Sequence, residues 1–286
     1  MKIAKITIAS HPLLSGKAFN FLNKDGFSSP YTLIAGQNGL GKTAFLESIT
    51  CLSTRFKDSQ PQQIAVFDYE LTDSEFETLV SDKLSQIDWQ EVNRKKISVK
   101  VISQFRDGKY VNSYEFQLYK DNGDIIWRDD LSEGFEAVRK VIYISLSGTG
   151  LRYVASETLN FTADGSEENS MTIQLKQYFE QMFPFVKKMT GYSEGQKVAE
   201  IPDGIVKEDL SAGEKQILSI GEFFIRHATS LYNSIILIDE PENYLHPEWQ
   251  KKIIDLFDKI AKESGDSEKK PPQFVFTTHS PYFLKN

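Results

Sequence analysis

The 286-residue sequence has one cysteine, no long apolar run and no excess of basic residues. A single cysteine, Cys51, cannot form an intrachain disulfide, which is typical of proteins from reducing compartments. The longest aliphatic run, residues 235–238, is far shorter than the roughly 20 residues that a membrane helix needs. The first residues alternate like a strand and lack the apolar block of a signal peptide. We therefore expect a cytoplasmic protein with no membrane partner.

The charge balance also excludes a class of function. Lys and Arg number 33 against 40 Asp and Glu, so the formal net charge is −7. This balance argues against binding of a polyanion over the whole surface, although a local basic groove stays open. The clearest basic clusters are Arg94–Lys96 with Lys100, and Lys187–Lys188. The first interpretation of both is a solvated face, and contact with DNA or RNA is the alternative.

The N-terminal part has the order strand, loop and helix. Alternating apolar residues predict strands over 1–10 and 17–21. A third apolar segment, residues 31–36, runs into a glycine-rich loop, and residues 43–50 are expected to form the helix that follows.

The middle of the chain changes its period. Residues 52–95 are polar and are expected to be mostly helical. From residue 97 to 118 the apolar residues alternate, and Asp107-Gly108 and Asn122-Gly123 supply hairpin turns, so we predict an antiparallel meander. Residues 139–145 form another expected strand, which ends at a turn at 148–150, and residues 171–190 an amphipathic helix.

The C-terminal third alternates helices with strands. A helix is expected after Ser211, an apolar strand at 234–238, a helix from Pro247 and a last strand at 274–278. This order is typical of an α/β domain with a parallel sheet.

Residues 36–43 read GQNGLGKT and match the pattern G-x-x-x-x-G-K-[ST]. Small residues let the backbone wrap a phosphate, so that successive N–H groups and the start of the next helix face the negative charge. We call this segment the phosphate loop. Lys42 is expected to reach the β- and γ-phosphates, and the Thr43 hydroxyl to bind Mg²⁺. The expected nucleotide-binding residues are Gly36, Asn38, Gly39, Gly41, Lys42 and Thr43.

The second motif is the acid pair Asp239-Glu240, which directly follows the apolar strand expected at 234–238. At the carboxyl end of a strand, Asp239 can hold the coordination shell of Mg²⁺, usually through water. Glu240 can polarise a water molecule for in-line attack on the γ-phosphate. A strand that ends in solvated acids would look the same in isolation, and the phosphate loop is what favours the catalytic interpretation.

Two further segments carry a resemblance. Residues 210–216, LSAGEKQ, form what we call the signature segment, and residues 277–281, TTHSP, what we call the switch segment. With the two motifs above, in this order, the sequence resembles the ATP-binding-cassette ATPases, whose signature is LSxGE(K/R)Q. The resemblance covers about the first fifty and the last eighty residues. The glutamine loop of that family cannot be placed, and Gln104 is one candidate for it.

The resemblance implies roles for these residues. Ser211 caps a helix and Gly213 leaves its backbone N–H accessible, so the helix start suits an anion. In the family, two protomers pack head to tail, and Ser211, Gly213 and Glu214 would then close over the ATP of the partner. His279 would hydrogen-bond the γ-phosphate and sense its loss. A core role for the helix and a structural role for the histidine are the alternatives.

The phosphate loop and the sequence DEPENYLHP at 239–247 resemble the SMC-like and RecF-like branch, especially the OLD and Septu PtuA-like groups. That resemblance implies a bacterial anti-phage defence ATPase that acts with a nuclease or toxin partner. A RecF-like ATPase that clamps DNA is one alternative, and a scaffold that binds ATP with little turnover is another.

We therefore predict one ABC-type ATPase domain over residues 1–286, of the α/β class with an antiparallel β-subdomain and a helical lobe that presents the signature segment. Its core would comprise 1–50 and 205–286, with 51–204 inserted, and the chain would be the N-terminal part of a longer protein or would meet its effector on another chain. Mg-ATP would be hydrolysed slowly and would drive formation of a homodimer or a higher oligomer.

Overall fold

The computed structural model describes residues 1–37, 39–50, 63–81, 91–106, 109–147, 150–155, 170–183, 185, 210–262, 270–281 and 283. Several residues discussed above lie outside this described part: Asn38, Cys51, Asp107-Gly108, the turn residues 148–149, and Lys187–Lys188.

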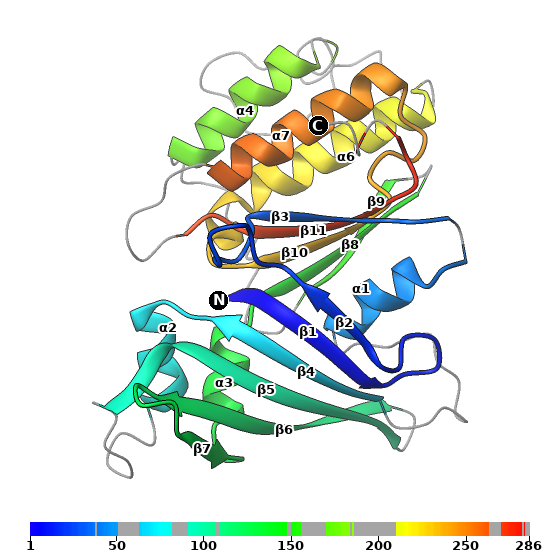
Figure 1. Ribbon diagram of the computed structural model, residues 1–286. Coiled ribbons are helices and arrows are strands. Elements are labelled where there is room, and N and C mark those ends of the chain that lie inside the picture. Colours follow the sequence, from blue (N-terminus) through cyan, green and yellow to red (C-terminus); the bar gives the residue numbers. More distant parts are fainter. Residues whose placement is uncertain are drawn as a thin grey trace.

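One of the two sheets is antiparallel and six-stranded, in the order β2-β1-β4-β5-β6-β7 (Figure 1). Its strands are β1 (Lys2–Ser10), β2 (Lys17–Asn20), β4 (Gln63–Glu70), β5 (Val92–Arg106), β6 (Lys109–Lys120) and β7 (Ile125–Arg128). The alternation at Ile97, Val99 and Val101 places these side chains in the core, as period-two patterning requires. Gly123 turns between β6 and β7 with a φ of 90°, a conformation that glycine adopts without strain. The predicted meander is confirmed.

The expectation of a mostly helical segment at 52–95 is wrong for residues 63–70, which form β4 between β1 and β5. Ala65, Phe67 and Tyr69 are buried and their neighbours less so, which is the period of a strand with one covered face. The segment is short and flanked by polar residues, so the composition hid this alternation. Among the described residues of this range, those from 92 to 95 belong to β5, and Asp73–Val80 form the helix α2, as expected.

The second sheet is mostly parallel and has the order β3-β11-β10-β8-β9. Its strands are β3 (Tyr31–Ala35), β11 (Gln273–Thr278), β10 (Ile235–Asp239), β8 (Val141–Ser147) and the antiparallel edge strand β9 (Gly150–Ala155). Because parallel strands end at the same edge, Asp239 lies in register with Thr277 on one side and Ser145 on the other. Ala35, which leads into the phosphate loop, pairs with Thr278 at that edge.

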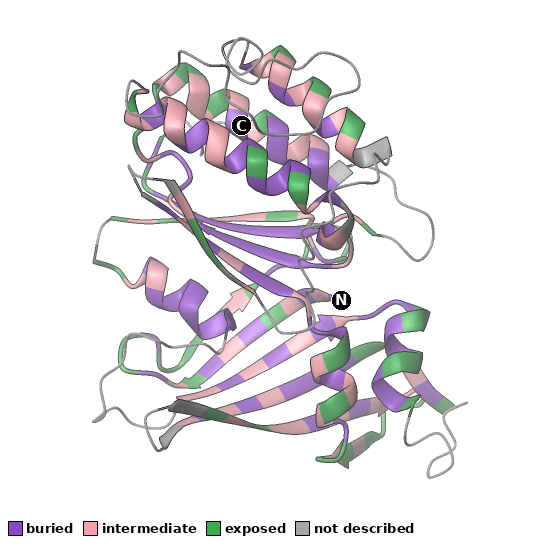
Figure 2. Ribbon diagram, turned by 180° about the vertical axis from the view of Figure 1, so that it is seen from behind, coloured by how far each residue is buried: buried purple, intermediate pink, exposed green. Residues whose placement is uncertain are grey.

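The parallel sheet separates two apolar cores, since alternate residues of β10 belong to one core or to the other. Figure 2 shows the strands in the middle of this sheet as buried. Ile235 and Leu237 face α1 (Lys42–Thr50), which packs between the two sheets. Ile236 and Ile238 face the helices of the other side. These helices are α4 (Ser170–Met182), α6 (Ala212–Arg226), α7 (Pro247–Lys262) and the short 3₁₀ helix η4 (Ala228–Leu231). Helices α2 and α3 (Ser132–Val138) cover the antiparallel sheet.

The strands of the two sheets do not divide the chain into the predicted core, residues 1–50 and 205–286, and the predicted insertion, residues 51–204. Strands β1 and β2 pair with the middle of the chain in the antiparallel sheet, whereas β8 lies inside the parallel sheet next to β10. Such pairing depends on contacts remote in sequence, which periodicity does not reveal. Within the described residues, no helix is long and apolar enough to cross a membrane.

Candidate functional site

The phosphate loop joins the end of β3 to the start of α1, as expected. Gly39 and Gly41 have φ values of 84° and 85°, which side chains with a Cβ rarely adopt. A Cβ at Gly41 would also contact Leu13 and Leu14 of the turn after β1. The Gly36 N–H donates to the Thr278 carbonyl at 3.4 Å, so the loop starts beside the end of β11. The loop therefore has the strand–loop–helix geometry of a phosphate site.

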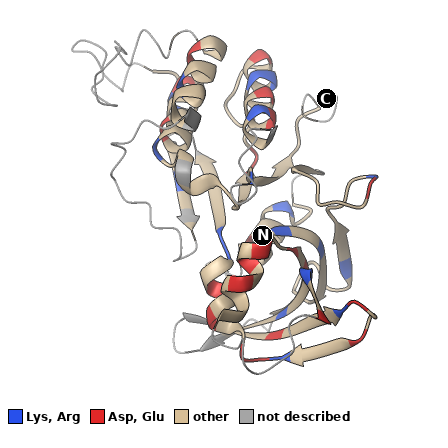
Figure 3. Ribbon diagram, turned by 90° about the vertical axis from the view of Figure 1, so that its left-hand side faces the viewer, with Lys and Arg blue, Asp and Glu red and all other residues tan. Residues whose placement is uncertain are grey.

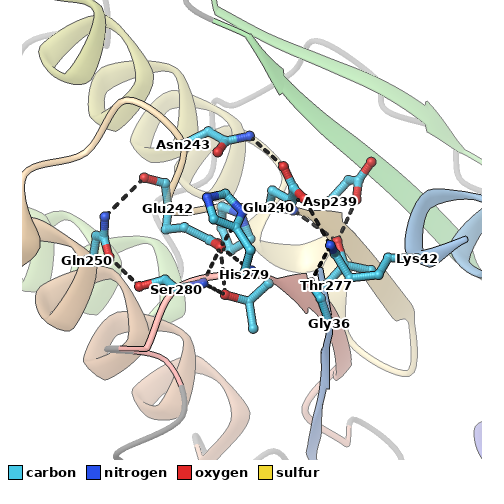
Figure 4. Close-up of polar contacts among 12 residues, drawn as sticks. Gly36, Lys42, Asp239, Glu240, Glu242, Asn243, Gln250, Thr277, His279 and Ser280 are labelled. Atoms are coloured by element: carbon cyan, nitrogen blue, oxygen red, sulfur yellow. Dashed lines mark hydrogen bonds and ion pairs between the residues drawn. The ribbon is translucent and has the colours of Figure 1, made fainter. Parts of the chain in front are cut away.

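Lys42, the first residue of α1, directs its ammonium back over this loop (Figure 4). Its Nζ donates to the carbonyls of Gly36, at 2.8 Å, and Gln37, at 3.2 Å. Nζ also lies 3.4 Å from Glu240 Oε1, and the side chain is 7% exposed. A buried ammonium held among loop carbonyls and a carboxylate is well placed to meet a further anion.

Asp239 is the meeting point of several hydroxyl groups at the edge of the parallel sheet. Thr43 Oγ1 donates to Asp239 Oδ2 at 2.8 Å, and Thr277 Oγ1 donates to Oδ1. Tyr143 of β8 donates to Oδ2 at 3.4 Å. The structure thus brings together Thr43 and Asp239, the two residues predicted to hold a metal ion.

The donor set suits magnesium. A threonine hydroxyl and a carboxylate are hard oxygen ligands, which Mg²⁺ prefers, and it usually completes its shell with water and substrate phosphates. The described residues contain no group of three or more His, Cys, Asp or Glu side chains placed to enclose a metal. Thr43 and Asp239 therefore fit an ion shared with a nucleotide rather than an ion enclosed by protein.

Glu240 follows Asp239 in a strained backbone conformation, with a φ of 46°. Its N–H lies 3.2 Å from the Thr277 carbonyl and 3.1 Å from Thr277 Oγ1. Asn243 Nδ2 donates to Glu240 Oε2 at 3.0 Å, and Oε1 lies 3.5 Å from His279 Nδ1. The carboxylate thus stands between Lys42, Asn243 and His279, as Figure 4 shows.

These neighbours control the ionisation of Glu240. Burial alone would raise the pKa of its carboxyl. The Asn243 hydrogen bond, the histidine and the Lys42 ammonium outweigh that effect, so the pKa lies below its ordinary value of 4.5. Glu240 is therefore an anion at neutral pH and can accept a proton.

His279 lies at the end of β11, next to a second carboxylate. Its Nδ1 is 3.5 Å from Glu240 Oε1 and also 3.5 Å from Glu242 Oε1. The imidazole is 44% exposed, whereas the Glu242 side chain is 2% exposed. The histidine can thus reach solvent while one edge of its ring faces two acids.

The signature segment forms the start of α6, on the other face of the sheet from α1. Ser211 is the N-cap, and with Glu214 it forms a capping box in which Ser211 N and Oγ both donate to Glu214 Oε2. Gly213 packs so closely that a Cβ there would lie 2.8 Å from the Tyr244 carbonyl oxygen. Gln216, fully buried, donates from Nε2 to the Pro241 carbonyl at 2.9 Å.

The predicted residues therefore fall into two groups. Lys42, Thr43, Asp239, Glu240 and His279 are joined by contacts at the carboxyl edge of the sheet, together with Gly36. Ser211, Gly213 and Glu214 form a separate group at the start of α6. Gln104 lies on β5, opposite Val111, in the antiparallel sheet rather than in the sheet that carries the phosphate loop. Asn38 lies outside the described residues.

Five residues that support this site were given no role from the sequence: Tyr143, Thr277, Glu242, Asn243 and Gln250. Thr277 lies in the switch segment, and Asn243 in the stretch 239–247, and a polar residue close to a catalytic acid is a weak signal that could have marked them. Tyr143 contacts Asp239 only because β8 pairs with β10, which no local pattern indicates.

Two members of the basic cluster on the antiparallel sheet are paired with acids. Arg94 pairs with Glu77 at 3.0 Å and lies over the Phe76 ring, and Lys100 pairs with Glu115 at 2.9 Å. Figure 3 shows basic residues interspersed with acidic ones over the described chain. These pairs favour the solvated-face interpretation over contact with nucleic acid.

Comparison with known proteins found one family that matches part of the chain, and several similar proteins. Residues 191–285 match the family described as "AAA domain, putative AbiEii toxin, Type IV TA system". The chain is similar to the Septu protein PtuA of Bacillus thuringiensis, with 24% identity over 300 residues that cover 92% of this chain and 69% of that protein. It is also similar to the retron Ec83 probable ATPase of Escherichia coli, with 38% identity over 81 residues that cover 25% of this chain and 14% of that protein.

Among solved structures, the fold is similar to that of the SMC head domain from Thermotoga maritima. The TM-score is 0.53 at 15% sequence identity, and the match covers 100% of this chain and 92% of the other. This likeness confirms the predicted fold class, since it extends over both sheets and the helices that cover them.

Proposed function

We propose that this chain is an ATPase that hydrolyses Mg-ATP at the carboxyl edge of the parallel sheet, as its phosphate loop and its similarity to the AAA domain family and to the Septu protein PtuA support. One observation carries this proposal: residues from three separate segments converge there, with Thr43 bonded to Asp239 and Glu240 held between Lys42 and His279. A chance cluster would not combine a phosphate loop, two oxygen ligands for a metal and an ionised base.

The residues divide the chemistry between them. The phosphate loop and Lys42 would bind the β- and γ-phosphates, and Thr43 and Asp239 would hold the Mg²⁺ that neutralises their developing charge. Glu240 would take a proton from the attacking water. The water oxygen would bond to the γ-phosphorus while the bond from that phosphorus to the β–γ bridging oxygen breaks. His279 would meet the γ-phosphate with the ring edge that faces away from the two carboxylates.

Two protomers would close on the nucleotide head to tail. Helix α6 and α1 lie on opposite faces of the parallel sheet, which argues against contact between Ser211 and a phosphate bound by the same chain. Ser211 is exposed at a helix start, where backbone N–H groups favour an anion. A second copy could therefore supply the signature segment, and ATP would link the copies.

The test compares the native chain with Glu240→Gln, and uses Glu248→Gln as a control because Glu248 is an exposed glutamate at the start of α7. We expect Glu240→Gln to lower ATP turnover by about 10²-fold or more, as loss of a positioned base does, while ATP binding persists. The inactive variant should accumulate as an ATP-dependent dimer in light scattering, and Glu248→Gln should behave as native. Equal turnover in the native chain and Glu240→Gln would remove Glu240 as the base.

We further propose that this ATPase controls a nuclease or toxin partner in anti-phage defence. The similarity to the Septu protein PtuA and to the retron Ec83 probable ATPase supports this role. The test measures phage plaquing on cells that carry the native locus, with the native chain or with Lys42→Ala. Protection that survives Lys42→Ala would contradict the role. Strong stimulation of turnover by DNA, without any partner, would favour a DNA clamp instead.

A further inference from the structure

Glu242 is a buried carboxylate that the catalytic scheme does not use. It lies two residues after Glu240, and only 2% of it is exposed. A buried carboxylate is costly to desolvate, so proteins keep one there only where it is well bonded or has a function. Its Oε2 is buried and has no hydrogen-bond partner among the described residues. An acid that is half satisfied in this way is not placed for stability alone.

The other carboxylate oxygen of Glu242, Oε1, accepts hydrogen bonds from the switch segment. Oε1 accepts hydrogen bonds from Thr278 Oγ1 at 2.6 Å, from His279 N at 2.9 Å and from Ser280 N at 3.2 Å (Figure 4). Three donors from consecutive residues fix the backbone on both sides of the histidine. The segment that carries His279 is therefore attached to the loop that carries Glu240.

A neighbouring pair braces the same connection. Ser280 Oγ donates to Gln250 Oε1 at 2.6 Å, and Gln250 Nε2 donates to the Leu245 carbonyl at 3.0 Å. Gln216 of α6 donates to the Pro241 carbonyl. The loop of residues 240–246, which carries Glu242, is thus bonded both to α6 and to the switch segment.

Glu242 also faces the imidazole itself. His279 Nδ1 lies at the same distance, 3.5 Å, from Glu242 Oε1 and from Glu240 Oε1. Two anions on one ring edge favour the form that carries a proton on Nδ1, and the partner of one ring nitrogen decides which tautomer a histidine adopts. Nε2, on the opposite edge, is then left to face the nucleotide.

We infer that Glu242 is a positioning residue for ATP hydrolysis, which sets the orientation and the tautomer of His279 and holds the switch segment to the loop that carries Glu240. This inference rests on the proposed function, because His279 acts on the γ-phosphate only if the site hydrolyses ATP. Glu242 itself touches neither phosphate nor metal in this role.

Two substitutions separate the parts of this role. Glu242→Ala removes both the anchoring of the switch segment and the charge beside Nδ1. Glu242→Gln keeps a carbonyl oxygen that can accept the same three hydrogen bonds, and removes only the charge. We expect Glu242→Ala to lower kcat by about 10–100-fold, as loss of an orienting partner does, with little change in the affinity for ATP. Glu242→Gln should lie between it and the native chain.

The first measurement needs no turnover. Nitrogen-15 spectra of the histidine rings, with the signals of His279 assigned by their loss in His279→Ala, report which nitrogen carries the proton. The sequence has only four histidines, so the spectra are simple. The native chain should show His279 protonated on Nδ1, and both Glu242 variants should change that state. Unchanged His279 signals in both variants would overturn the inference, whatever the turnover of the native chain.

The second measurement is a double-mutant cycle of Glu242→Ala with His279→Ala. If Glu242 acts through His279, the double variant should lose no more kcat than His279→Ala alone. Losses that multiply would show that Glu242 acts elsewhere and would overturn the inference. Thermal unfolding of Glu242→Gln checks that the fold is kept, and Glu248→Gln is the control. A native chain without turnover would contradict the proposed function, and the ring-nitrogen signals would still decide the role of Glu242.

Discussion

Thr43 and Asp239 are 196 residues apart in the chain, and Thr43 Oγ1 donates a hydrogen bond to Asp239 Oδ2 at 2.8 Å. The contact forms because β3, which leads into the phosphate loop, and β10 both end at the carboxyl edge of one parallel sheet, where β11 lies between them. It joins the last residue of the phosphate loop to the residue that would share its metal.

This contact predicts a change in magnesium dependence. Asp239→Asn keeps the size of the side chain but removes its negative charge, so Mg²⁺ should bind more weakly. We expect turnover to fall at least about tenfold and the magnesium concentration for half-maximal turnover to rise. Asp255→Asn, at an exposed position of α7, is the control. A native magnesium titration in Asp239→Asn would show that Asp239 does not hold the metal.

The ionisation of Glu240 predicts a shift in pH dependence. Burial opposes its negative charge, and the Asn243 hydrogen bond is first among the interactions that lower its pKa. Asn243→Ala should therefore raise the pKa, so the base becomes protonated at a higher pH. The acidic limb of the turnover profile should move to higher pH than in the native chain. Asn93→Ala in the antiparallel sheet should leave that limb in place, and an unmoved limb in Asn243→Ala would contradict the assignment.

Much of the fold could be predicted from the sequence because its clearest patterns are local. The alternation from residue 97 to 118, the apolar run before Asp239 and the glycine pattern of the phosphate loop each depend on neighbours in the chain. Strand β4 was missed because its one short apolar stretch, residues 64–67, lies within a polar region. The pairing of β1 with β4, and of β8 with β10, is remote in sequence and has no local signal.

The candidate site could likewise be predicted only where its residues stand in local sequence patterns. Lys42, Thr43, Asp239 and Glu240 stand in patterns whose spacing follows from backbone geometry around a phosphate. Glu242 stands in the same stretch, and nothing in the letters separates a buried acceptor from a solvated acid. Only the approach of β11 shows that its carboxylate bonds three residues of the switch segment.

The packing of Gly213 predicts a stability effect. A Cβ at this position would lie 2.8 Å from the Tyr244 carbonyl oxygen, which is closer than such atoms approach, so Gly213→Ala must displace the loop. Overpacking of this kind costs about 1–3 kcal/mol, and the free energy of unfolding in urea should fall accordingly. Ser219→Ala on the same helix, where the hydroxyl donates to the Lys215 carbonyl one turn back, should change it by less than about 0.5 kcal/mol. Native stability in Gly213→Ala would contradict this close contact.

Burial of His11 predicts a loss of stability in acid. The residue is 4% exposed, and burial lowers its pKa below the ordinary 6.5. Below pH 6.5 the unfolded chain therefore binds a proton that the folded chain does not, and stability falls as the pH drops toward the folded pKa. In His11→Asn, which can keep an acceptor for the Leu13 N–H, this fall should be smaller. Urea unfolding at neutral and mildly acidic pH, with exposed His246→Asn as the control, measures it.

Two capping boxes in the described part of the chain allow a role in the dimer to be separated from a role in the helix. Ser211 and Glu214 cap α6, and Thr72 and Glu75 cap α2 with the same reciprocal bonds. Ser211→Ala and Thr72→Ala should each lower the free energy of unfolding by about 1 kcal/mol, because each leaves helix N–H groups without an acceptor. Only Ser211 stands where a second copy could place ATP against the helix start. Ser211→Ala in the Glu240→Gln background should therefore weaken the ATP-dependent dimer in light scattering, and Thr72→Ala should not. If both substitutions weaken the dimer equally, the effect is one of helix stability, and the signature segment does not bind the nucleotide of the partner.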